Sequence, residues 1–201
     1  MDSSGAAAAL ERFWKRRDAL LSKGKAAPAL HQRMEQNAGA HTLAQRDIVA
    51  SLDREFARLH SRSLGIIEHT PASLLYEASA PPGLRSIGEN VLRSAAVIEQ
   101  TFGGLTANLW DDPFEWTLPE QLSTPATVLA HLLEVEETRT HAFRSFSDDS
   151  CLLKSIATPA DGLVSLIELL LKTILRAAHY QSRATVALDA LSGINPSGLI
   201  I

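Results

Sequence analysis

The segment from Leu163 to Leu191 restricts the fold of this chain more than any other part of the sequence. It reads LVSLIELLLKTILRAAHYQSRATVALDAL, and apolar residues occur on nearly all sides of it before Arg176. A helix that is apolar all round is buried by its neighbours. The sequence predicts this helix from near Asp161, after Thr158-Pro159, to Ser192-Gly193. Its predicted inward residues are Leu163, Ile167, Leu170, Ile174 and Ala178.

Three further helices are predicted from apolar residues at helical spacing. They run from about Asp47 to His69, from about Ser86 to Phe102 and from about Thr124 to Phe146. Ser86 and Glu89 have the spacing of a capping box, and Thr124-Pro125 places an N-cap before a proline at the first helical position. No strand is predicted, and Asp161-Gly162 is expected to lead into a helix rather than to close a hairpin. The fold class is therefore all-α, and helices of this length suit a four-helix bundle.

The regions outside these helices suggest an extension and a loop. Residues 1 to 45 are predicted to be an N-terminal helical extension, with one amphipathic helix at Leu10 to Leu21, and residues 46 to 201 are predicted to be the bundle domain. The link from Trp110 to Trp116 is aromatic and acidic, and it either plugs the edge of the core or covers a pocket. The polar residues predicted to face solvent on the third helix are Glu134, Glu136, Glu137 and Arg139.

Composition excludes several classes of partner. The chain has 201 residues and a formal net charge of −4, so we expect no nucleic-acid partner. The apolar run Leu169 to Leu171 is interrupted by Glu168 and Lys172 on either side, far short of the roughly 20 apolar residues of a membrane-spanning helix, and no membrane partner is expected. The single cysteine, Cys151, excludes an intramolecular disulfide. Without a secretory pattern at the start, a cytoplasmic protein is the expectation.

Two short segments resemble the DinB-like four-helix bundle superfamily. The segment Ser86 to Arg93, SIGENVLR, is similar to the family's second-helix pattern, and Arg93 stands where that pattern ends in a metal-binding histidine. Tyr180 to Arg183, YQSR, is similar to the His-Arg-Gly-Gln of the last helix, and Arg176 lies four residues before Tyr180, where a further histidine is expected. The resemblance implies an up-down-down-up type bundle that often pairs as a homodimer. It also implies a zinc or nickel site of three imidazoles, as in thiol transferases and hydrolase-like members of the family.

The three substitutions remove the chemistry that the resemblance implies. A guanidinium has no lone pair for a metal, so Arg93 and Arg176 cannot act as imidazoles do, and no metal cofactor is expected there. Two arginines and the Tyr180 phenol are instead suited to a small anionic ligand, a carboxylate or a phosphate. The other interpretation is a solvent-exposed stripe, because Lys172, Arg176, Tyr180 and Arg183 recur at helical spacing.

Three hypotheses of function remain open at this point, and so does the question of whether the protein is an enzyme. The first is a metal-independent small-molecule binding protein or enzyme. In it Arg93 and Arg176 bind the anion, Tyr180 acts as hydrogen-bond donor or catalytic acid, and Trp110 and Trp116 form a lid. The second is a non-catalytic homodimer whose role is assembly. The third is a divalent-metal-dependent transferase or hydrolase with rebuilt ligands, and its candidate ligands are His131, Glu134 and His179.

Overall fold

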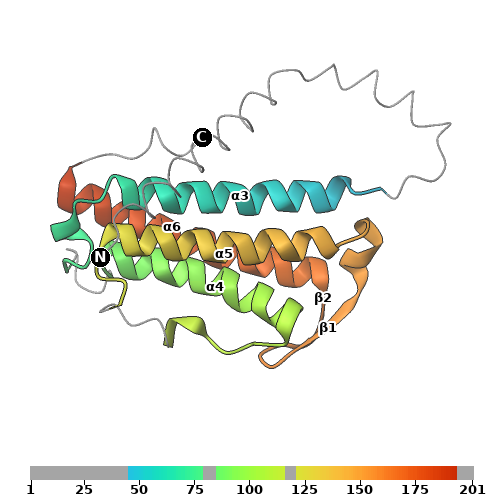
Figure 1. Cartoon of the computed structure of the whole chain (residues 1–201). Helices are drawn as coiled ribbons and strands as arrows, with labels where there is room; N and C mark the ends of the chain where they lie inside the picture. The colour runs from blue at the N-terminus through green and yellow to red at the C-terminus, as the bar shows by residue number, and fades with distance from the viewer. Residues whose placement is uncertain (1–44, 79–84, 116–120, 194–201) are drawn as a thin grey trace, which may run out of the picture. The chain divides into compact units, whose positions relative to one another are not determined.

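The computed structural model describes residues 45–78, 85–115 and 121–193, which are mostly helical (Figure 1). The four long helices in this part of the chain are α3 (Asp47–Glu68), α4 (Ile87–Ala107), α5 (Pro125–Ser145) and α6 (Leu166–Ser192). The short 3-10 helices are η1 (Ala72–Leu74), η2 (Pro113–Glu115) and η3 (Asp149–Leu153). The predicted extension, residues 1 to 45 with its helix at Leu10 to Leu21, lies outside the described residues apart from Gln45. None of the described helices is both long and apolar enough to cross a membrane.

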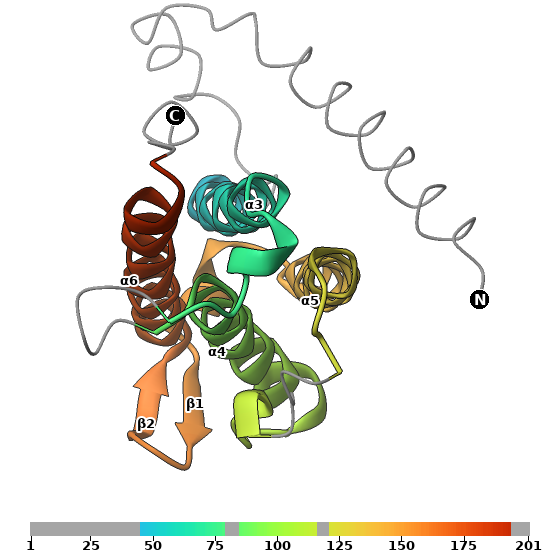
Figure 2. The same ribbon diagram turned by 90° about the vertical axis from the view of Figure 1, so that its left-hand side faces the viewer.

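The four helices pack side by side as a bundle. Seen end-on, they follow one another around the bundle in the order α3, α5, α4, α6 (Figure 2). The most extensive packing joins α4 to α6, and α3 contacts both α5 and α6. Helices α3 and α6 run in one direction, whereas α4 and α5 run in the other (Figure 1). The predicted helical fold is confirmed.

Local capping explains where the helices begin. The Ser86 and Glu89 side chains form the predicted capping box at the start of α4. Thr124 caps α5 by accepting a hydrogen bond from the Thr127 backbone N–H, with Pro125 at the first helical position. The first turn of α3 is capped from a distance, because an Asp149 carboxylate oxygen accepts a 2.9 Å hydrogen bond from the Val49 N–H. The starts of α4 and α5 are therefore set by local sequence, whereas the start of α3 depends on a tertiary contact.

Three aromatic rings form the centre of the core where α3, α4 and α5 meet. Phe56 and Phe102 lie edge to face with ring centroids 5.1 Å apart, and each lies 5.6 Å from the ring of Phe143. All three side chains are buried. Rings at these separations contribute pairwise attraction in addition to the burial of their area. This cluster holds the three helices together at one level of the bundle.

The prediction that the chain has no strand is wrong. Strands β1 (Ser155–Thr158) and β2 (Gly162–Ser165) pair antiparallel, with Ser155 opposite Ser165 and Thr158 opposite Gly162. Gly162 has φ +70°, a left-handed conformation that glycine adopts without strain, and the turn before it is held by an Asp161 N–H donating to Thr158 Oγ1. The last helix therefore begins at Leu166 rather than near Asp161.

The predicted inward face of the last helix was also mostly wrong. Leu170 is buried as expected, but Leu163 lies on β2 and is 76% exposed. Ile167, Ile174 and Ala178 are only half-buried. The residues that α6 buries are Leu166, Leu169, Leu170, Thr173, Ala177, Gln181, Ala184, Ala187 and Leu188. With α6 in this orientation, Arg176 and Tyr180 lie on the side of the helix next to α4.

Candidate functional site

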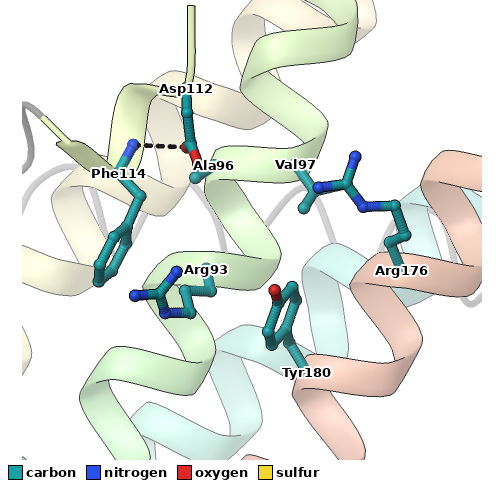
Figure 3. Close-up of a pocket in the computed structure, with 7 residues that line it drawn as sticks. All are labelled: Arg93, Ala96, Val97, Asp112, Phe114, Arg176 and Tyr180. Atoms are coloured by element: carbon teal, nitrogen blue, oxygen red, sulfur yellow. Dashed lines mark hydrogen bonds between the residues drawn. The ribbon is translucent and has the colours of Figure 1, made fainter. Parts of the chain in front are cut away.

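Arg93, Arg176 and Tyr180 line one hollow between α4 and α6 (Figure 3). Its volume is about 10 Å³, which is close to the smallest space that holds one water molecule. The other lining residues are Ala96, Val97, Asp112 and Phe114. The structure thus brings together the three residues that were expected to bind an anion, one from α4 and two from α6.

Hydrogen bonds between the two helices set the register that creates this hollow. Ser94 Oγ donates to the Ala177 carbonyl oxygen at 3.1 Å, and the hydroxyls of Thr101 and Thr173 lie 2.7 Å apart. All four residues are buried. Because α4 and α6 are antiparallel, these two contacts fix their relative position, and Arg93 comes to lie opposite Arg176 and Tyr180.

Arg93 is held in place, and one of its donors is unpaired within the described residues. Its guanidinium carbon lies 3.9 Å from the centroid of the Phe114 ring, a cation–π arrangement. Its Nε is buried and has no hydrogen-bond partner among the described residues. A buried donor without a partner costs free energy, which a ligand oxygen would recover. Within the described part of the chain, neither Arg93 nor Arg176 forms an ion pair.

The link after α4 supplies the other wall of the hollow. Asp112 Oδ1 accepts a 3.0 Å hydrogen bond from the Phe114 backbone N–H, which fixes the turn that carries both side chains (Figure 3). The Asp112 carboxylate opposes an anion, but two guanidinium groups line the same hollow, so one positive charge remains in excess. The sequence had drawn attention to the tryptophans of this link, and the parts played by Asp112 and Phe114 were missed.

A larger pocket of about 450 Å³ lies next to the hollow, along the adjoining turns of α4 and α6. Its walls come from α4, from α6, from the turn of the β1–β2 hairpin and from Trp110. Figure 2 places the hairpin on the α4 and α6 side of the bundle. Arg176 lines both the hollow and the pocket. The two spaces therefore follow one another along one groove and meet at Arg176.

Trp110 is fixed as a wall of this larger pocket. Its indole Nε1 donates to Asn108 Oδ1 at 3.0 Å, and its carbonyl oxygen accepts from Gln100 Nε2 at 2.7 Å. Its ring lies so close to Gly104 that a Cβ there would overlap the ring. Trp110 therefore lines the pocket and not the hollow, while Trp116 lies outside the described residues.

The alternative metal ligands do not assemble. His131 Nε2 on α5 lies 3.8 Å from Glu99 Oε2 on α4, whereas His179 on α6 is exposed and packs its ring against Tyr180. No group of three or more His, Cys, Asp or Glu side chains within residues 45–78, 85–115 and 121–193 is arranged to hold a metal ion. His131, Glu134 and His179 therefore do not meet as a ligand set.

The polar stripe on α6 supports in part both interpretations, the anion site and the solvent-exposed face. Arg176 is exposed, while Lys172, Tyr180 and Arg183 are half-buried. Lys172 is engaged with Glu168 at 3.0 Å and with Asp161 at 3.5 Å. One member of the stripe is thus a paired surface charge, while Arg176 and Tyr180 line the hollow.

Glu99 provides a pH-dependent prediction. Partial burial raises the pKa of its carboxyl, Glu134 raises it further, and His131 opposes the rise. A folded pKa above the ordinary value of 4.5 means that stability is lost as the pH rises through the folded pKa. Glu99→Gln is therefore expected to raise the midpoint of thermal unfolding at pH 7.5 and to lose this advantage below about pH 4.5.

The measurement is differential scanning calorimetry across this pH range, with Glu137→Gln as the control. Glu137 is exposed on α5, so its replacement is expected to leave the midpoint nearly unchanged. A lower midpoint for Glu99→Gln at pH 7.5 would show that the carboxylate stabilises the fold.

The chain was also compared with known proteins. No family model, no curated protein and no solved structure matches it.

Proposed function

We propose that this protein binds a small organic anion, a carboxylate or a phosphate, in the hollow between α4 and α6. Arg93 and Arg176 would bind the anion, and the Tyr180 hydroxyl would donate a further hydrogen bond. The observation that carries the proposal is the meeting of two arginines around one hollow. Neither has an ion-pair partner among the described residues, and the buried Arg93 Nε has no hydrogen-bond partner among them. Guanidinium groups bind carboxylates and phosphates through paired N–H donors.

The geometry of the hollow agrees with an anion that enters from solvent. At about 10 Å³ it admits one oxygen atom of a ligand while the rest stays outside. Arg93 is held against Phe114, so it forms a preset inner contact. Arg176 is exposed and without an ion pair among the described residues, so it can turn to contact the same anion. Tyr180 lies between them and is also the candidate proton donor for a reaction at this site.

Membership of the DinB-like superfamily belongs to the same proposal. Two of the four helices run against the other two in the order up, down, down, up, as the resemblance implies (Figure 1). The positions that resemble the family's three histidines, Arg93, Arg176 and Tyr180, meet at one hollow. Both observations support a bundle in which the place of a metal site has become a metal-independent anion site.

The test is an NMR-detected titration of the full chain with acetate and, separately, with inorganic phosphate at low ionic strength. Arg93→Met and Arg176→Met are each expected to weaken binding about 10- to 100-fold, because a hydrogen bond to a charged group contributes about 1.5 to 3 kcal/mol. Arg58→Met is the matched control, since Arg58 is an exposed arginine on α3 that does not line the hollow. It is expected to bind as the unmodified protein does.

Two outcomes would reject the anion site. One is saturable binding that neither Arg93→Met nor Arg176→Met weakens, and the other is no binding of either anion by the unmodified protein. Arg93→Lys separates charge from geometry, because lysine keeps the charge but loses the planar fork. Circular dichroism spectra identical to that of the unmodified protein would exclude unfolding as the cause of a loss.

A further inference from the structure

The 450 Å³ pocket beyond Arg176 is large enough to hold part of a ligand. Sites for small organic molecules have volumes of about 300 to 1,000 Å³, so the pocket is in this range and the hollow is far below it. On α4 the pocket begins at Gln100, one turn after the hollow residues Ala96 and Val97. On α6 it extends from Arg176 back toward Leu169. A ligand bound at Arg176 can therefore extend along the groove into the pocket.

Most of the hydrogen-bonding groups on the helix walls of the pocket already have partners. Gln100 Nε2 donates to the Trp110 carbonyl oxygen at 2.7 Å. The Thr101 and Thr173 hydroxyls lie 2.7 Å apart, so one donates to the other. The second can donate to a carbonyl oxygen of its own helix, Val97 O at 3.0 Å from Thr101 or Leu169 O at 2.9 Å from Thr173. A polar group of a ligand would find few free partners on these walls and would lose its own water on entering.

The charged side chains that line the pocket also have partners, with one exception among the described residues. Lys172 forms ion pairs with Asp161 at 3.5 Å and with Glu168 at 3.0 Å, which compensates its charge. Arg176 is the one charged lining residue without such a partner among the described residues. The remaining surface includes the side chains of Trp110, Leu169 and Leu175, together with Pro159 and Ala160 of the hairpin turn. The pocket thus has an apolar body and a single cationic end.

We propose that the ligand is a monocarboxylic acid with a short apolar tail. Its carboxylate binds at Arg93, Arg176 and Tyr180, and its tail lies in the pocket against Trp110 and Leu175. This inference rests on the proposed anion site and adds the class of molecule that the site takes. The hollow favours a carboxylate over a phosphate, because a monoanion neutralises the one positive charge in excess, whereas a phosphate dianion would leave one negative charge without a partner.

The experiment is a titration of the full chain with acetate, butanoate, hexanoate and octanoate at constant pH and salt. The charge stays the same along this series while the tail grows. Each added CH2 is expected to tighten binding about two- to fourfold, so hexanoate should bind at least about 16-fold more tightly than acetate. Two further probes are hexan-1-ol, which lacks the charge, and hexyl phosphate, which replaces the carboxylate by a dianion. Both are expected to bind more weakly than hexanoate.

A pair of leucines on α6 tests the position of the tail. Leu175 lines the pocket and is 70% exposed, whereas Leu171 is 47% exposed on the same helix and does not line it. Leu175→Gln is expected to weaken hexanoate several-fold and to leave acetate unchanged. Leu171→Gln should leave both unchanged. Because both leucines are exposed, neither change should unfold the protein.

The outcomes separate the two proposals. If all four acids bind equally and Arg176→Met weakens them all, the anion site stands and the apolar tail is rejected. If the affinity rises with chain length but Leu175→Gln does not reduce the rise, the tail lies elsewhere and the inference is wrong. If hexyl phosphate binds more tightly than hexanoate, the carboxylate assignment is overturned. If none of the four acids binds and inorganic phosphate also fails to bind, both proposals are rejected.

Discussion

Replacement of Phe102 by alanine is expected to lower the free energy of unfolding by about 3 to 5 kcal/mol. Phe102 is 1% exposed, and its ring contacts those of Phe56 and Phe143 at centroid distances of 5.1 and 5.6 Å. Alanine would remove the ring from the point where α3, α4 and α5 meet, and the surrounding helices would close the resulting space only in part. Chemical denaturation followed by circular dichroism measures the loss.

The matched control is Phe102→Leu. Leucine keeps most of the apolar volume, so its expected cost is about 1 kcal/mol. A cost below about 1 kcal/mol for Phe102→Ala would contradict the aromatic cluster as the centre of the core, because full burial of a ring is worth more than this. Equal losses for the two variants would instead show that ring shape, rather than volume, matters at this position.

Replacement of Arg139 by methionine is expected to lower the free energy of unfolding by about 2 kcal/mol. Arg139 is 4% exposed on α5, donates to Glu136 at 2.7 Å and forms an ion pair with Asp53 on α3. Burial lowers the pKa of its guanidinium, but Glu136 and Asp53 outweigh burial and raise it. Removing one partner of a buried pair costs about 3 to 5 kcal/mol. The smaller figure applies here because Asp53 is half exposed and retains water.

Arg58→Met provides the control for this second result. Arg58 pairs with Glu55 at the same i, i+3 spacing as Arg139 with Glu136, but its side chain is 70% exposed. Its loss is expected to cost less than about 0.5 kcal/mol. Equal effects of the two substitutions, measured by urea denaturation, would show that Arg139 contributes only through its helical pair and that the link to α3 is unimportant.

Arg139 also shows where sequence reasoning was limited. Together with Glu134, Glu136 and Glu137 it was predicted to face solvent, and it is buried because its partner Asp53 lies 86 residues earlier on another helix. The capping box at Ser86 and the N-cap at Thr124 were predictable, since each is formed within four residues. The hairpin was missed because each strand has only four residues, too few for a clear alternation of apolar and polar side chains.

The phase of α6 failed for a different physical reason. Its first half is apolar nearly all round, so the sequence does not say which side meets the bundle. Polar contacts decide it instead. Gln181 is fully buried and donates to Leu59 O at 2.7 Å, and Thr173 bonds Thr101 across the groove. The family resemblance predicted the group Arg93, Arg176 and Tyr180. Nothing in the sequence predicted their neighbours Asp112 and Phe114, because the link after α4 meets the two helices only in the folded chain.

The central claim is that one anion contacts Arg93 and Arg176 together, and the most direct measurement follows their side-chain Nε–H groups by 1H–15N NMR during addition of hexanoate. We expect the Arg93 and Arg176 signals, assigned from the two methionine variants, to shift with one common saturation curve. The Arg93 Nε–H, which has no hydrogen-bond partner in the described part of the chain, is expected to move downfield as it gains an acceptor. The signal of Arg58 should remain in place. Small shifts of all the arginine signals, linear in hexanoate concentration and without saturation, would contradict an anion site between α4 and α6.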